Sequence, residues 1–118
     1  MYRYYNANPM LNNIEDCSIR ALSVAENISW DEAYRILSDY ARKRGLMLSS
    51  VMSIEQFLDD NYNRVCNYDM TVQDFIEENP YGTYLITMPG HITVVKDGIN
   101  YDTFSTLKRK MWCAWEVI

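Results

Sequence analysis

Several patterns that assign a chain to a familiar class are missing from this sequence of 118 residues. No apolar run approaches the roughly 18 residues that cross a bilayer, and residues 1–6 lack the apolar core of a secretion signal. Positive charge is scarce, with 11 Lys and Arg against 16 Asp and Glu. Nucleic-acid binders need a basic face to neutralise phosphates. We therefore expect a cytoplasmic protein that contacts neither membranes nor nucleic acid.

Recognised metal and nucleotide motifs are missing too. The three cysteines, Cys17, Cys66 and Cys113, are odd in number and have no CxxC spacing, so they match neither a disulfide framework nor a zinc site. No GxxxxGK or GxGxxG stretch occurs. The sequence thus predicts reduced thiols, no metal and no cofactor, with Cys66 and Cys113 as packing residues.

What is present suffices for one folded domain spanning residues 1–118. Hydrophobic residues make up 48% of the chain and aromatic residues 14%, which is typical of a globular protein with a single core. The amphipathic spacing and the capping signals, S-x-x-E at Ser29 and S-x-x-Q at Ser53 among them, predict helices in the first two-thirds. These helices, counted with their capping residues, are expected over 16–26, 29–45, 53–61 and 71–79.

The last third changes to a strand pattern of β-branched residues separated by turns. Strands are expected over 83–88, 91–96, 99–104 and 112–118, forming an antiparallel sheet. Residues 1–15 are expected to be an extended, partly ordered lead-in, and the structure of 46–52 and 62–70 is left open. The sequence therefore predicts an α+β fold in which N-terminal helices pack on a C-terminal antiparallel sheet.

The hairpin at Asp97 and Gly98 brings an acid to the only histidine of the chain. If these two residues form the whole turn, Thr93 lies opposite Asp102. Side chains alternate along a strand, so His91 shares a face with Thr93 and becomes the diagonal neighbour of Asp102, within reach of its carboxylate. A bulge at the turn would instead place the two on opposite faces.

Cys17 is placed at the expected start of the first helix, after a polar loop. The helix N-terminus favours a thiolate, although a free cysteine there is usually a small buried hydrophobe. Together with His91 and Asp102 it completes a nucleophile, base and orienter for covalent acyl transfer. The backbone N–H of Cys17 and a side chain of Asn12 or Asn13, with a preference for Asn12, are expected to form the oxyanion hole.

Two charged residues flank this cysteine. Asp16 is expected to cap the helix or to complement its dipole in the first turn. Arg20 is expected to form a structural ion pair with Asp16 or with an acid elsewhere. Among the tryptophans, Trp112 and Trp115 are expected in the core or at its rim, and Trp30 or a tyrosine is a candidate for a cleft wall.

Several segments resemble the papain-like cysteine peptidase superfamily, and most closely the compact C39-like proteins of bacteria and phages. That superfamily has the same chain order, which implies that Cys17 is the nucleophile, His91 the base and Asp102 the orienter. A glutamine oxyanion donor six residues before the cysteine is common in it, and here that position is Leu11. The resembling segments are DCSIRAL at 16–22, GTYLI at 82–86, GH at 90–91, DG at 97–98 and YDT at 101–103, whereas residues 46–81 have no counterpart.

These observations predict a cysteine peptidase or a related amidase that acts on a protein or peptide through a thioester acyl-enzyme. The same residues also serve transamidation and deubiquitination, and the sequence does not separate these reactions. A second hypothesis is a catalytically weak or inactive papain-like fold that serves as an acidic protein-binding module. A third is a structural domain in which Cys17 is buried far from His91.

Overall fold

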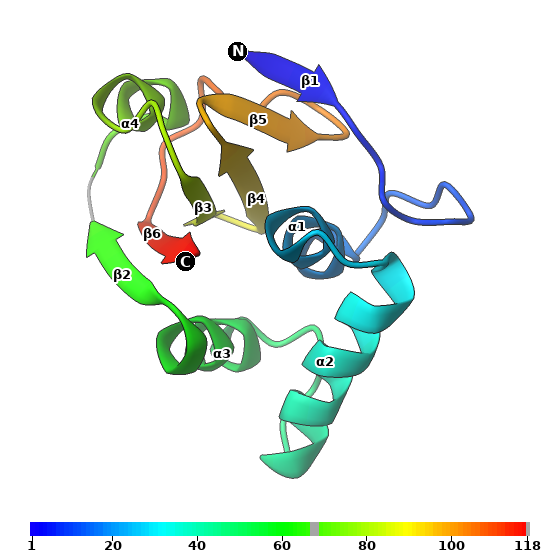
Figure 1. The fold of residues 1–118 in the computed structure, drawn as a ribbon. Coiled ribbons are helices and arrows are strands. Elements are labelled where there is room, and N and C mark those ends of the chain that lie inside the picture. Colours follow the sequence, from blue (N-terminus) through cyan, green and yellow to red (C-terminus); the bar gives the residue numbers. More distant parts are fainter. Residues whose placement is uncertain (67–68, 118) are drawn as a thin grey trace.

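The structure, a computed structural model, describes residues 1–66 and 69–117 and has an α+β fold (Figure 1). Its helices in these residues are α1 (Cys17–Glu26), α2 (Trp30–Lys43), α3 (Val51–Asn61) and α4 (Val72–Glu78). Its strands are β1 (Tyr2–Tyr4), β2 (Asn63–Cys66), β3 (Thr83–Met88), β4 (His91–Lys96), β5 (Ile99–Asp102) and β6 (Cys113–Val117). The α+β class expected from the sequence is confirmed.

The strands form one mixed sheet in the order β1-β5-β4-β3-β6-β2. The four C-terminal strands pair antiparallel as expected, but β1 adds to the edge of β5 in parallel and β2 adds to β6. The prediction of a purely antiparallel C-terminal sheet is therefore corrected. Hairpin signals identify strands that follow one another in the chain, whereas β1 pairs with a strand from the far end of the sequence.

Helix boundaries follow the capping signals in α2 and α4. Ser29 Oγ accepts a hydrogen bond of 3.1 Å from the Glu32 N–H, and Gly45, just beyond α2, has a left-handed φ of +69°. Thr71 and Asp74 form a complete capping box, in which each side chain binds the other residue's backbone N–H. These reciprocal bonds satisfy the N–H groups that an isolated helix end leaves without partners.

The ends of some elements differ from the expectation. Helix α3 begins at Val51, so Ser53 is buried within its first turn instead of capping it. The carboxylate of Asp16 forms no capping bond to α1, although the residue occupies the N-cap position. Strand β5 ends at Asp102 rather than at residue 104. Of the expected last strand, residue 118 lies outside the described residues, as do residues 67–68 of the segment left open.

The helices cover both faces of the sheet. Helices α1, α2 and α3 pack through an apolar cluster on one face, which includes Leu22, Val94 and the fully buried Trp115. Helix α4 packs against the other face through a second apolar cluster around Phe75 and Val95. Because α1 lies against β4 and β5, its first residue comes close to the start of β4. None of the described helices has the length and apolar character that a bilayer span requires.

Candidate active site

The β4–β5 hairpin has the predicted register, and this register brings His91 to Asp102. Both turn residues, Asp97 and Gly98, have left-handed φ angles of 49° and 78°, which a two-residue hairpin turn of the I′ type requires. His91 Nε2 and Asp102 Oδ2 are 2.7 Å apart and share a hydrogen bond. The predicted neighbourhood of the only histidine and this acid is confirmed.

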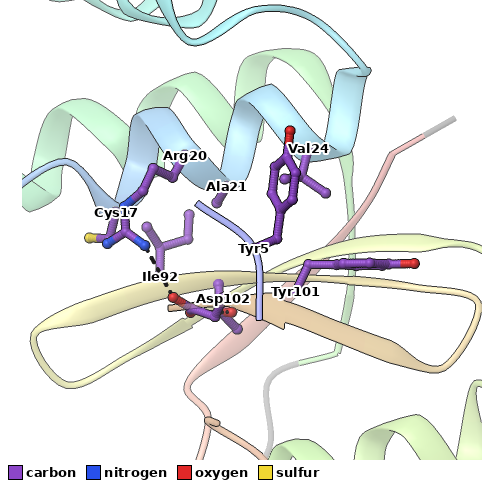
Figure 2. A pocket seen from close by; sticks show the side chains of 9 residues that line it. Tyr5, Cys17, Arg20, Ala21, Val24, Ile92, Tyr101 and Asp102 are labelled. Carbon is purple, nitrogen blue, oxygen red and sulfur yellow. Dashed lines mark hydrogen bonds and ion pairs between the residues drawn. The ribbon is translucent and has the colours of Figure 1, made fainter. Parts of the chain in front are cut away.

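The carboxylate of Asp102 is buried and accepts hydrogen bonds at both oxygens. Oδ2 binds His91 and accepts 2.7 Å from Thr93 Oγ1, while Oδ1 accepts 2.7 Å from the Thr103 N–H. Oδ1 also accepts 3.2 Å from Arg20 Nη1, and Figure 2 shows this contact. Burial raises the pKa of Asp102, but its hydrogen bonds and the charge of His91 outweigh burial and lower it. The charged carboxylate therefore holds the His91 ring in one orientation.

Cys17 lies against the other side of the imidazole. Because Nε2 of His91 faces Asp102, the ring offers its other nitrogen to the thiol, with which it is hydrogen-bonded. Burial raises the pKa of Cys17, but bonds from His91 and from the Ile92 N–H, with the charges of His91 and Arg20, lower it below the usual value. Burial lowers the pKa of His91, but Asp102 and Cys17 raise it to about 9. Each group thus favours the charged form of the other, a thiolate beside an imidazolium.

Arg20 links this trio to a second buried acid. Its Nε donates 2.8 Å to Asp16 Oδ1, while its Nη1 reaches Asp102. Asp16 Oδ2 in turn accepts bonds of 2.9 Å from Asn8 Nδ2 and 3.0 Å from Trp30 Nε1. The ion pair expected of Arg20 is confirmed with both acids. The expected capping role of the Asp16 side chain is wrong, because its oxygens bind these donors, and no sequence spacing pointed to Asn8 or Trp30 as partners.

Cavities lie on two sides of Cys17, which is half-buried. One, of about 10 Å³, lies between α1 and the sheet and is lined by Arg20, Tyr5 and Asp102 among others (Figure 2). The other, of about 460 Å³, is lined by both Cys17 and His91 and by Trp112 at its rim. The larger cavity gives a ligand access to the thiol. Trp115 is buried in the core as expected, whereas Trp112 is 47% exposed and lines this cavity instead of the core.

The two asparagines expected in the oxyanion hole do not line either of these cavities. Both side chains are exposed, and Asn12 Oδ1 accepts a bond of 3.2 Å from the Ile14 N–H, which closes a local turn. Leu11, at the position of the superfamily's glutamine, is 74% exposed and has a left-handed φ of 59°. The assignment of Asn12 or Asn13 as oxyanion donor stays a prediction.

An aromatic side chain that the sequence analysis did not single out covers the imidazole. The ring of Phe104 lies 4.8 Å from that of His91, centroid to centroid, at an interplanar angle of 41°. The guanidinium of Arg109 lies over the same Phe104 ring, 4.9 Å from its centroid. Apolar cover of this kind shields the hydrogen bond between His91 and Asp102 from water, which strengthens it.

No family model matches this chain, and no curated protein or solved structure compared with it matches either. Within residues 1–66 and 69–117, no group of three or more His, Cys, Asp or Glu side chains has the arrangement of a metal site. The chemistry of the site therefore has to be argued from its own geometry.

Proposed function

We propose that this protein is a cysteine peptidase or a related amidase with a papain-like fold, acting in the cytoplasm on a protein or peptide. One observation carries the proposal. Cys17, His91 and Asp102 form a hydrogen-bonded series in which the pKa of the thiol is lowered and that of the imidazole is raised. A cysteine that serves only for packing has no need of a buried charged partner, whereas a nucleophile does.

The proposed reaction has two halves, acylation of Cys17 and hydrolysis of the thioester, and all three side chains act in each. The Cys17 sulfur attacks the carbonyl carbon of an amide, and the imidazolium of His91 gives its proton to the departing amine, leaving a thioester. Water then attacks the thioester while His91 accepts one of its protons. The carboxylic acid departs, and the thiolate and imidazolium are restored. Asp102 keeps the ring oriented and stabilises its charged form throughout.

The proposed papain-like architecture draws on the order of elements. The nucleophile begins a helix, and the base and the acid follow on adjacent strands of a sheet that this helix covers. Helix α1 has ten residues, and Cys17 is the first of them, so the unpaired N–H groups of the helix end lie next to the sulfur. This location favours both the thiolate and the oxyanion that forms during attack.

The proposal is tested by labelling at neutral pH with a peptidyl acyloxymethyl ketone, followed by peptide mapping. We expect the label on Cys17, none on the buried Cys113, and at least a hundredfold slower labelling of a His91→Ala variant, the lower bound for losing a general base. Cys17→Ala controls for labelling elsewhere. Equal labelling rates for Cys17 and Cys113, or for the wild type and the His91 variant, would contradict an activated nucleophile.

The alternative, a binding module that keeps the fold without turnover, is favoured by the position of the asparagines. Asn12 and Asn13, the side-chain oxyanion donors expected from the loop, do not line the cavities at Cys17. Incubation with a p-nitrophenyl ester separates the two functions. An amidase releases nitrophenol continuously, whereas a module with a reactive thiol but no deacylation releases one equivalent and stays acylated.

A further inference from the structure

The larger cavity beside Cys17 has an unequal distribution of charge. Two carboxylate side chains, those of Glu15 and Glu55, line it, and no lysine or arginine of the described chain does. Among the described residues of its wall, His91 alone can carry a positive charge, and this ring is hydrogen-bonded to Cys17 and to the carboxylate of Asp102. Apart from His91 and the groups bonded to it, the cavity therefore presents negative charge to a ligand.

Glu55 is the more informative of the two acids. It lies on α3, is half-buried, and forms no hydrogen bond or ion pair with any residue in 1–66 or 69–117. The acids that follow on the same helix differ, because Asp59 pairs with Arg64 and Asp60 pairs with Arg44. A carboxylate in a cavity wall that has no counter-charge in the described protein can pair with a cation that a ligand supplies.

An apolar wall lies next to these acids. The apolar residues Leu48 and Ile54 line the same cavity, and Trp112 adds an aromatic surface. Apolar walls with a few placed polar groups are typical of ligand sites, and an aromatic face also attracts cations. A ligand that matches both features carries an apolar group and a positive charge close together.

We propose that the cavity accepts a peptide segment in which an apolar side chain neighbours a lysine or arginine, with Glu55 as the main specificity-determining residue. The cationic side chain pairs with the Glu55 carboxylate, the apolar one lies against Leu48 and Ile54, and Glu15 at the cavity wall adds to the negative field. This inference rests on the proposed function, since it names the substrate class of the same site.

The first experiment measures the charge of the cavity without requiring turnover. Methanethiosulfonates transfer an S–R group to a thiolate and release methanesulfinate, and they exist with matched cationic (trimethylammonioethyl) and anionic (sulfonatoethyl) groups. Relative to free 2-mercaptoethanol, we expect the cationic reagent to modify Cys17 about fivefold faster than the anionic one at low salt. Glu55→Gln reduces this preference about twofold, and Glu55→Lys reverses it.

Glu78→Gln serves as the matched control, because it removes one exposed carboxylate from α4, on the other face of the sheet. It should leave the preference unchanged. A preference that is absent in the wild type, or equal in the Glu55→Gln and Glu78→Gln variants, would overturn the inference. Melting temperatures of all variants confirm that the comparison is made between folded proteins.

The second experiment uses three acyloxymethyl ketones that carry Leu-Lys, Leu-Gln or Leu-Glu. We expect labelling rates in that order, with Lys over Glu by about tenfold in the wild type and about threefold in Glu55→Gln. Labelling by none of the three, with the methanethiosulfonate preference intact, would support the acidic site and contradict the peptidase. A Lys to Glu ratio that Glu55→Gln does not change would overturn the specificity role of Glu55.

Discussion

Two buried regions of the molecule are built on different principles. Between α1 and the ends of β4 and β5, three charged side chains are buried, Asp16, Arg20 and Asp102, and they form one connected series. Under α4, the buried cluster around Phe75 and Val95 contains apolar side chains and a tyrosine but no charged group among the described residues. The same small domain thus excludes charge from one region and concentrates it in the other.

The contrast indicates where the chain is adapted to function rather than to stability. Buried ion pairs are seldom more stabilising than apolar side chains of similar volume, because their desolvation offsets their attraction. The cluster under α4 shows that this sequence can bury side chains without any charged group among them. The charged series at the ends of β4 and β5 leads to Cys17 and His91, and under the proposed function it orients and charges these two groups.

The sharpest test of this contrast compares Arg20→Met with Phe75→Ala. Each should lower the free energy of unfolding by about 3–5 kcal/mol, the first by removing the guanidinium that two buried acids share and the second by leaving a cavity. Urea unfolding measures both. Only Arg20→Met should slow the alkylation of Cys17, and an equal slowing by Phe75→Ala would show that general loosening controls reactivity.

The pH dependence of stability should also be confined to the charged region. The pKa of His91 is raised from 6.5 to about 9, so the protonated ring stabilises the fold fully below pH 6.5. This contribution is lost as the pH rises through about 9. Urea midpoints measured from pH 6 to 10 should therefore fall in the wild type. The fall should be absent from a His91→Gln variant and retained in Phe75→Ala.

A smaller effect is expected one hydrogen bond away from the acid. Thr93 Oγ1 donates to Asp102 and accepts 2.9 Å from Asn100 Nδ2. Thr93→Val keeps the shape but removes this bridge, which should cost about 1–2 kcal/mol of unfolding free energy and slow Cys17 alkylation severalfold. Thr93→Ser keeps the hydroxyl and should restore the alkylation rate, whereas a rate that stays low would assign the effect to packing.

The smallest effect is expected at the N-terminus of α4, which Thr71 caps. Thr71→Ala removes the hydroxyl that accepts 3.1 Å from the Asp74 N–H and should cost about 1 kcal/mol of unfolding free energy. The alkylation rate of Cys17 should not change, since α4 packs on the opposite face. Any change in that rate would show that the charged region and the cluster under α4 are coupled through the sheet, which would contradict their separate roles.

The elements that could be predicted from the sequence are those with local causes. The hairpin at Asp97 and Gly98 was predictable because a two-residue turn fixes the register of its strands. That register located the contact of His91 with Asp102. Helix α4 was predictable because Thr71 and Asp74 satisfy its first N–H groups.

What escaped prediction depends on contacts between distant segments. Strand β1 has only three residues, two of them exposed, and pairs with β5 from the opposite part of the chain. Asn8 and Trp30 approach Asp16 only once the loop before α1 has folded back, so no spacing announces them. The cavity wall that includes Glu55 likewise forms only when α3 is placed beside the start of β4 and the residues before β6.

The edge pairing of β1 has a consequence for synthesis on the ribosome. The hydroxyl of Tyr2 donates 3.0 Å to the carbonyl of Asp102, a residue 100 positions later. In the parallel pairing of β1 with β5, Tyr4 lies opposite the same Asp102. Cys17 leaves the exit tunnel long before His91 and Asp102 do. Until β4 and β5 have formed beside α1, the Cys17 thiol therefore lacks the contact with His91 that lowers its pKa.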